Sequence, residues 1–193
     1  MKVALLGDAT SVHVQRWARW LTSRGHEVMV ASFKIGAVKG VRVYSLRRFR
    51  PTSRLLEPLM FLAAALWVKR LLARERVDLL HCHVATDYGV VGAFTGFHPF
   101  FVSPWGTDIS ELAERSLLKR LLLRFLVFRR ADVVHVEDPS MYWRVLKLGA
   151  SRNVKMVRVG VDPELFKPPE FKEGSGRVRI LCLRKLKDKY GAV

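Results

Sequence analysis

The chain has 193 residues, a length that provides for one well-buried core, or for one domain and part of a second. Half of its residues (50%) are hydrophobic, which excludes a disordered tail. Its formal net charge of +17 is unusual for a globular chain and indicates an anionic partner, which could be nucleic acid, an acidic membrane surface or a phosphorylated ligand.

Short β-rich runs alternate with helical stretches along the chain, which is typical of a parallel sheet with helices on both faces. The expected strands are residues 3–6, 27–31, 41–46, 78–82, 100–103, 133–136, 154–157 and 178–183. The expected helices are 13–24, 54–75, 86–96, 110–130, which a break could interrupt, and 139–148. About seven strands precede residue 160, so we predict an α/β fold with a Rossmann-like parallel sheet.

The residues after this lobe change in composition. A stretch rich in proline, glycine and charge is followed by one apolar strand, after which the sequence stops. We therefore expect a Rossmann-like lobe at 1–160, an interlobe linker at 161–176, and the first strand of an incomplete second lobe at 177–193. On this interpretation the chain is a fragment or a product cut short.

Cysteine usage and the apolar runs bear on the compartment. Cys82 and Cys182 lie far apart in apolar contexts without a CxxC pair, so we expect reduced core thiols in a cytosolic protein. Asp8 interrupts the first apolar run too early for a secretory signal. The apolar run at 58–68 is too short to span a bilayer, so a membrane role would be at the surface.

The loop after the first strand is a candidate site, because this position faces the ligand crevice of a doubly wound sheet. Gly7 permits a tight turn, and Thr10 or Ser11 is suited to cap the next helix. His13 and Arg16 could reach a ligand from the start of that helix. An ordinary capped turn explains the same residues.

A histidine pair marks the fourth expected strand. His81 and His83 alternate in strand geometry and therefore face the same side of the sheet. Two histidines without a third ligand are a weak metal signal, so we predict no metal site. We expect His81 to be a hydrogen-bonded core residue and His83, nearer the carboxyl end, to line the crevice.

The stretch FVSPWGTDIS at 101–110 ends the fifth expected strand at Pro104, which has no N–H to donate to a neighbouring strand. Gly106 allows an unusual backbone angle or the close approach of a ligand. Thr107 or Asp108 is suited to cap a helix that begins near Ile109, and Asp108 could instead accept hydrogen bonds from a sugar hydroxyl.

Five segments in this order resemble the amino-terminal lobe of family 4 retaining glycosyltransferases, which have the two-lobed GT-B fold. They are HVQRWARWLTSRGHEVMVAS, VDLLHCHVATDYG, PFFVSPWGTDI, RRADVVHVEDPSMYWRVLKLGA and VGVDPELFKPP. The final RILCLRKLKDKYGAV is similar to the segment that opens the second, nucleotide-binding lobe.

The resemblance implies transfer of a sugar from a nucleotide-sugar donor to an acceptor with retention of configuration and without a cofactor. It places the acceptor side of the cleft at Gly7, Ser11, His13, His83, Trp105, Gly106 and Asp108. It places the donor diphosphate at Arg184, Lys185 and Lys189. Many relatives have histidine where Trp105 stands, so no catalytic residue is carried over, and Trp105 is expected to stack on a sugar. Without the second lobe, the chain is expected to be inactive alone.

The segment 115–130 is expected to form a basic amphipathic helix. Its expected apolar face is Leu117, Leu118, Leu121, Phe125 and Phe128, and its basic residues are Arg115, Lys119, Arg120, Arg124 and Arg130, with Leu123 and Val127 among them. Such a helix suits anionic lipid at the inner face of the cell membrane, and a lipid-linked acceptor; packing on the sheet is the alternative. The competing function is a non-catalytic Rossmann-like module that binds nucleic acid or another polyanion, although no RNA-recognition signature or zinc-finger spacing is present.

Overall fold

The structure, a computed structural model, describes residues 1–50, 53, 55–109, 116–150, 153–164 and 166–167. The chain divides into two compact units, Met1–Val159 and Gly160–Val193. In the described part of the second unit, the backbone N–H of Glu164 donates to the carboxylate of Asp162 at 3.0 Å, and that of Phe166 donates to the Asp162 carbonyl at 3.0 Å. The first unit holds the sheet and the candidate site.

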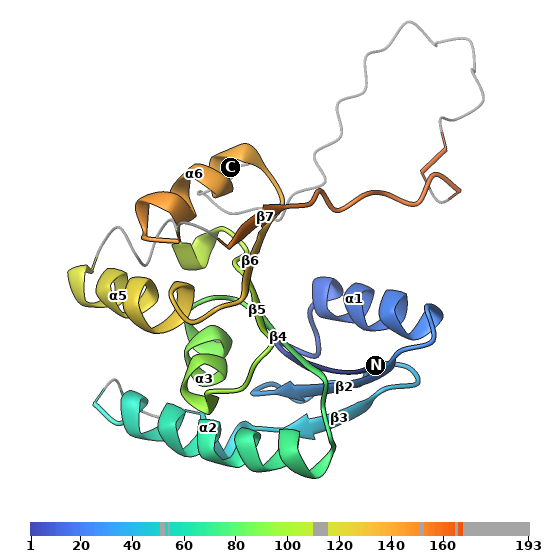
Figure 1. The fold of residues 1–193 in the computed structure, drawn as a ribbon. Coiled ribbons are helices and arrows are strands. Elements are labelled where there is room, and N and C mark those ends of the chain that lie inside the picture. The colour runs from blue at the N-terminus through green and yellow to red at the C-terminus, as the bar shows by residue number, and fades with distance from the viewer. Residues whose placement is uncertain (51–52, 54, 110–115, 151–152, 165, 168–193) are drawn as a thin grey trace, which may run out of the picture. The chain divides into compact units, whose positions relative to one another are not determined.

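Seven parallel strands form one sheet in the order β3-β2-β1-β4-β5-β6-β7 (Figure 1). They are β1 (Lys2–Leu6), β2 (Glu27–Ser32), β3 (Arg42–Ser45), β4 (Leu79–His83), β5 (Phe100–Ser103), β6 (Val133–Val136) and β7 (Val154–Met156). The strand order reverses between β1 and β4. In open parallel sheets the crevice outside the carboxyl ends at such a reversal is where ligands bind.

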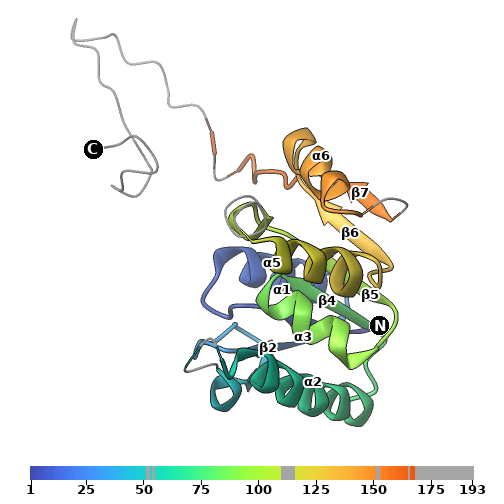
Figure 2. The same cartoon turned by 90° about the vertical axis from the view of Figure 1, so that its left-hand side faces the viewer.

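The described helices are α1 (Val12–Ser23), the short η1 (Arg47–Phe49), α2 (Glu57–Arg74), α3 (Asp87–Thr95), α5 (Leu117–Leu122), the π-helical turn η2 (Leu123–Phe128) and α6 (Pro139–Lys147). Helix α1 covers one face of the sheet, and α2, α3 and α5 form a layer on the other (Figures 1 and 2). No helix in the described ranges is long and apolar enough to cross a bilayer.

Side-chain alternation along each strand divides the core in two. On one face, Leu6, Leu80 and Val102 belong to the larger cluster, which also includes residues of α2, α3 and α6. On the other face, Leu5 and Val30 pack with residues of α1 in a smaller cluster. Toward the carboxyl ends of β4, β5 and β6, this second face carries polar side chains, so its chemistry changes where the crevice is expected.

The α/β prediction is confirmed, and the strands at 100–103 and 133–136 have the predicted bounds. The helix predicted at 110–130 allowed for a break, and its described residues from 117 onward form α5 and then a π turn. Residues 110–115, the predicted strand 178–183 and Cys182 lie outside the described residues. Cys82 is a buried free thiol, and burial raises its pKa.

Candidate functional site

Gly7 lies in the loop after β1, close to His83 at the end of β4. A Cβ added there would come within 2.7 Å of Cγ2 of Val14 and 3.1 Å of Cβ of His83. Gly7 has no positive φ, so the tight-turn reason expected from the sequence is replaced by a packing reason. The missing side chain lets α1 and the histidine strand approach each other closely.

The start of α1 brings the next two predicted residues into place. Ser11 is the N-cap, and its hydroxyl oxygen accepts a hydrogen bond of 3.3 Å from the backbone N–H of His13. The ring of His13 lies 4.0 Å, centroid to centroid, from the ring of Trp105. The first loop and the loop after β5 therefore meet through these two rings.

His83, the last residue of β4, is the least satisfied polar side chain at this edge. It is 1% exposed, and neither ring nitrogen has a hydrogen-bond partner. Burial, with the neighbouring His81, His135 and His13 adding to it, lowers the pKa of His83 well below its usual value, so the ring is neutral. A neutral imidazole offers one donor and one acceptor, and leaving each of them unpaired costs about 1 to 3 kcal/mol.

Two tryptophans border His83. The Trp105 ring is stacked against it with a centroid distance of 5.8 Å and an interplanar angle of 11°. From α1, Trp17 presents an edge-on contact to His81 at 5.0 Å and to His83 at 6.2 Å. Aromatic rings therefore lie beside the two nitrogens of the neutral His83 ring.

Next to these aromatic rings, a chain of hydrogen bonds links β4, β5 and β6. The Ser103 hydroxyl lies 2.7 Å from Nε2 of His81 and 2.9 Å from Nδ1 of His135, with a hydrogen bond to each. The other nitrogen of His135 donates to the backbone carbonyl of Val157 at 2.9 Å. Burial lowers the pKa of His81 to about 3. His81 is buried as predicted, but its hydrogen-bond partner is the side-chain hydroxyl of Ser103 and not the backbone.

Asp108 is not the helix cap that was one of the two roles expected of it. The helical turn starts at Thr107, so Asp108 lies within its first turn and is not the cap. Its carboxylate accepts hydrogen bonds from the backbone N–H of Trp105 at 2.9 Å and from that of Ala85 at 2.6 Å. The side chain is buried, which raises its pKa against the effect of these bonds. Each carboxylate oxygen therefore accepts one backbone hydrogen bond, and Asp108 positions two loops.

The loop that Asp108 holds contains a strained residue. Val84, directly after His83, has a φ of 80°, a region that β-branched residues rarely adopt. Its backbone N–H donates to the carbonyl of Ser103 at 2.9 Å, and its own carbonyl accepts from Gly89 at 2.9 Å. Gly106 has a φ of 98° with open space around an added Cβ, so the turn angle, rather than close approach, explains this glycine. Strain of this kind concentrates at functional sites.

The structure brings Gly7, Ser11, His13, His83, Trp105 and Asp108 to one edge, while the donor candidates Arg184, Lys185 and Lys189 lie outside the described residues. The sequence reading missed Trp17, Ser103 and His135. Two of them could have been found from the strand register, because Ser103 pairs with His83 and the β5–β6 register places His135 on the same face. Within the described ranges no group of three histidine, cysteine, aspartate or glutamate side chains is arranged to hold a metal ion.

The apolar face expected for the segment 115–130 is wrong in part, because a π turn changes which side chains are buried. Leu117, Leu118, Leu121 and Phe125 are exposed, whereas Phe128 is buried together with Leu123 and Val127. One side of this segment therefore packs in the core, and the other side exposes apolar residues. Arg115 and the side chain of Lys119 lie outside what the structure describes.

Comparisons with known proteins agree with this geometry. The family model described as Glycosyl transferase 4-like matches residues 2–138, and no curated protein matches the chain significantly. The fold is similar to that of a sucrose-phosphate synthase from Thermosynechococcus elongatus, with a TM-score of 0.67 and 18% identity over 87% of this chain and 50% of that chain.

Two further solved structures are similar. A glycosyltransferase from Rickettsia africae has a TM-score of 0.61 and 15% identity over 89% of this chain and 46% of that one. HepE from Anabaena, solved in complex with UDP and glucose, has a TM-score of 0.59 and 18% identity over 88% of this chain and 47% of that one. The chain thus spans about half the length of these three proteins.

Proposed function

Because the chain belongs to the glycosyl transferase 4-like family, we propose that residues 1–159 form the acceptor-binding side of a glycosyltransferase. The reaction would transfer a sugar from a nucleotide-sugar donor to the acceptor with retention of configuration at the transferred carbon. The observation that carries the proposal is His83, buried at the carboxyl edge with two unpartnered nitrogens.

The chemistry of this edge suits a carbohydrate. Sugars present an apolar C–H face, which packs on aromatic rings, and hydroxyls, which both donate and accept hydrogen bonds. Trp105 and Trp17 supply the rings, and neutral His83 supplies one donor and one acceptor. The neutral His83 ring carries no charge that would favour an anion over a sugar hydroxyl.

The donor would be bound by the second lobe. HepE, which shares the fold, was solved with UDP and glucose. We assign the donor diphosphate to Arg184, Lys185 and Lys189, because arginine and lysine form charge-assisted hydrogen bonds to phosphate oxygens. On this assignment residues 1–159 alone bind an acceptor and do not catalyse transfer.

The reaction would take place at the inner surface of the cell membrane on a lipid-linked acceptor. In support, Leu117 and Leu118 at the start of α5 are 71% and 76% exposed, and the chain carries a net charge of +17. Since the helices of a parallel α/β sheet begin at its carboxyl edge, these leucines lie at the same edge as His83. A membrane-bound acceptor would then reach the site without leaving the bilayer surface.

Saturation-transfer difference NMR tests the acceptor site. The probes are the methyl glycosides of glucose, galactose and mannose, added to the full chain. We expect saturation transfer to at least one probe, its loss in Trp105→Ala, and its retention in the matched control Trp143→Ala, which removes a tryptophan that is 62% exposed on α6. No transfer to any probe, or equal transfer in both variants, would overturn the proposal.

A further inference from the structure

The outer surface of α5 and η2 combines apolar and basic side chains without acidic ones. Its most exposed apolar side chains, called the exposed apolar set, are Leu117, Leu118, Leu121 and Phe125. Residues 116–131 include Arg120, Arg124 and Arg129 and contain neither aspartate nor glutamate. A contiguous apolar surface beside unopposed positive charge is complementary to an anionic bilayer.

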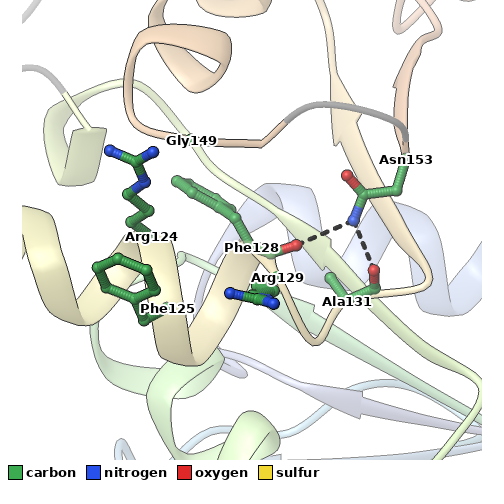
Figure 3. A pocket seen from close by; sticks show the side chains of 7 residues that line it. All are labelled: Arg124, Phe125, Phe128, Arg129, Ala131, Gly149 and Asn153. Carbon is green, nitrogen blue, oxygen red and sulfur yellow. Dashed lines mark hydrogen bonds between the residues drawn. The ribbon is translucent and has the colours of Figure 1, made fainter.

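The π turn brings two of these arginines to one place. The backbone N–H of Arg129 donates to the carbonyl of Arg124 at 3.2 Å, which is the bond to the fifth preceding residue that defines a π turn. In a regular α-helix, residues five apart point in different directions. Here the wider turn lets Arg124 and Arg129 both line the same cavity, with their guanidinium groups apart (Figure 3).

This cavity, of about 410 Å³, lies between η2 and the segments around Gly149 and Asn153 (Figure 3). Its remaining lining residues are Phe125, Phe128 and Ala131. The Asn153 side-chain amide donates to the carbonyls of Phe128 and Ala131, which occupies both of its N–H groups. The cationic groups of the cavity are therefore the two guanidinium groups.

Packing holds Arg124 in position. Gly149 has a φ of 103°, and a Cβ added to it would overlap Cγ of Arg124, so the arginine stem lies against bare backbone. The guanidinium carbon of Arg124 is 5.4 Å from the centre of the Phe125 ring. Among the described residues, no ion pair joins Arg124 or Arg129 to a carboxylate. A positioned Arg124 and a second guanidinium group in the same cavity, neither paired with a described carboxylate, are suited to binding a phosphate.

We propose that this cavity, the π-turn pocket, binds the phosphate of an anionic phospholipid headgroup while the exposed apolar set rests in the bilayer interface. Phe125 belongs to both the pocket lining and the apolar set, so the two surfaces are continuous. That continuity favours a lipid over a soluble phosphate, which would gain nothing from the leucines. The proposal rests on the membrane part of the proposed function and is independent of sugar binding.

Flotation of the full chain with vesicles tests the pocket. The probe is phosphatidylglycerol mixed with phosphatidylcholine, compared with phosphatidylcholine alone. Arg120→Gln, the matched control on the same helix, removes one charge outside the pocket and should weaken partitioning about fivefold, as expected for one basic residue near an anionic surface. Arg124→Gln and Arg129→Gln should each weaken it by more than this control.

Two variants separate the pocket from general charge. Arg124→Lys combined with Arg129→Lys keeps the charge and removes bidentate geometry. Gly149→Ala also keeps the charge and displaces the Arg124 side chain. Both should weaken partitioning at least as much as Arg120→Gln, with folding checked by circular dichroism. If the Lys variant, which introduces no steric conflict, partitions like the wild type, the pocket proposal is overturned even where Gly149→Ala misfolds.

The remaining outcomes identify which proposal fails. A wild-type chain that does not float with phosphatidylglycerol vesicles overturns both the pocket and the membrane part of the proposed function, and leaves the sugar site standing. Binding of free glycerol 3-phosphate as tight as that of vesicles would assign the pocket to a soluble ligand. A gel shift with RNA in the absence of vesicle binding would favour the polyanion-binding module.

Discussion

The carboxylate of Asp108 accepts a hydrogen bond of 2.6 Å from the backbone N–H of Ala85. This bond joins the loop after β5 to the loop after β4. Ala85 follows the strained Val84, and Val84 follows His83. The bond therefore stabilises the backbone that sets the direction of the His83 ring.

Replacing Asp108 with asparagine should cost about 1 to 3 kcal/mol in the free energy of unfolding. The amide offers one accepting oxygen, so either the Ala85 or the Trp105 N–H would face an NH₂ group and be left unpaired. Urea denaturation measures the loss, and Asp87→Asn, at an exposed residue in the first turn of α3, is the control. Equal stability of the two variants would show that the bond does not hold the loops together.

Replacing His83 with phenylalanine should raise stability and abolish sugar binding. The new ring retains an aromatic contact with Trp105 and removes two buried unpaired nitrogens, a gain of roughly 1 kcal/mol or more. Thermal unfolding and saturation transfer to the methyl glycosides measure the two effects in one sample. Lower stability combined with retained sugar binding would contradict a ligand role for the His83 nitrogens.

Replacing Gly7 with alanine should destabilise the fold by about 1 to 3 kcal/mol, because the added methyl group overpacks the contact between Val14 and His83. It should also reduce saturation transfer, since His83 must shift. Gly160→Ala is the control, because an added Cβ there meets no atom within 4 Å. A Gly7 variant as stable as this control would show that α1 moves aside freely.

Stability should fall as the pH drops below about 6.5. Burial lowers the pKa of His81 to about 3, so between these values the unfolded chain binds a proton that the folded chain excludes. The loss attributable to His81 is about 2 kcal/mol between pH 6.5 and pH 5. In His81→Gln the loss in the free energy of unfolding between pH 6.5 and pH 5, measured by urea denaturation, should be smaller by this amount. Measurements at pH 8 give the cost of the substitution itself. An unchanged pH dependence would mean that His81 takes up a proton while folded.

Most of the fold could be predicted because its signals are local. The runs FFVS and VVHV are bounded by turns or polar residues, and their strands have the predicted limits. The π turn at Leu123–Phe128 could not be predicted in this way. Its sequence has ordinary helical periodicity. Whether each backbone hydrogen bond joins residues four or five apart depends on how Phe128 and Val127 pack in the core.

The site was only partly predictable, because its residues meet through register and helix placement. Period-two alternation put His81 and His83 on one face, as observed. Trp17 lies on a helix, and its approach to three histidines depends on how closely α1 packs on the sheet, which Gly7 controls. Asp108 was expected at a helix cap, whereas its partner Ala85 is 23 positions away in sequence.

The hydrogen-bond chain that ends at Val157 runs in one direction. Nε2 of His135 donates to the Val157 carbonyl, so its Nδ1 accepts from the Ser103 hydroxyl, which in turn accepts from Nε2 of His81. All three donors therefore point the same way, from β4 across β5 and β6 to the backbone that follows β7, and the floor of the crevice is polarised along that line.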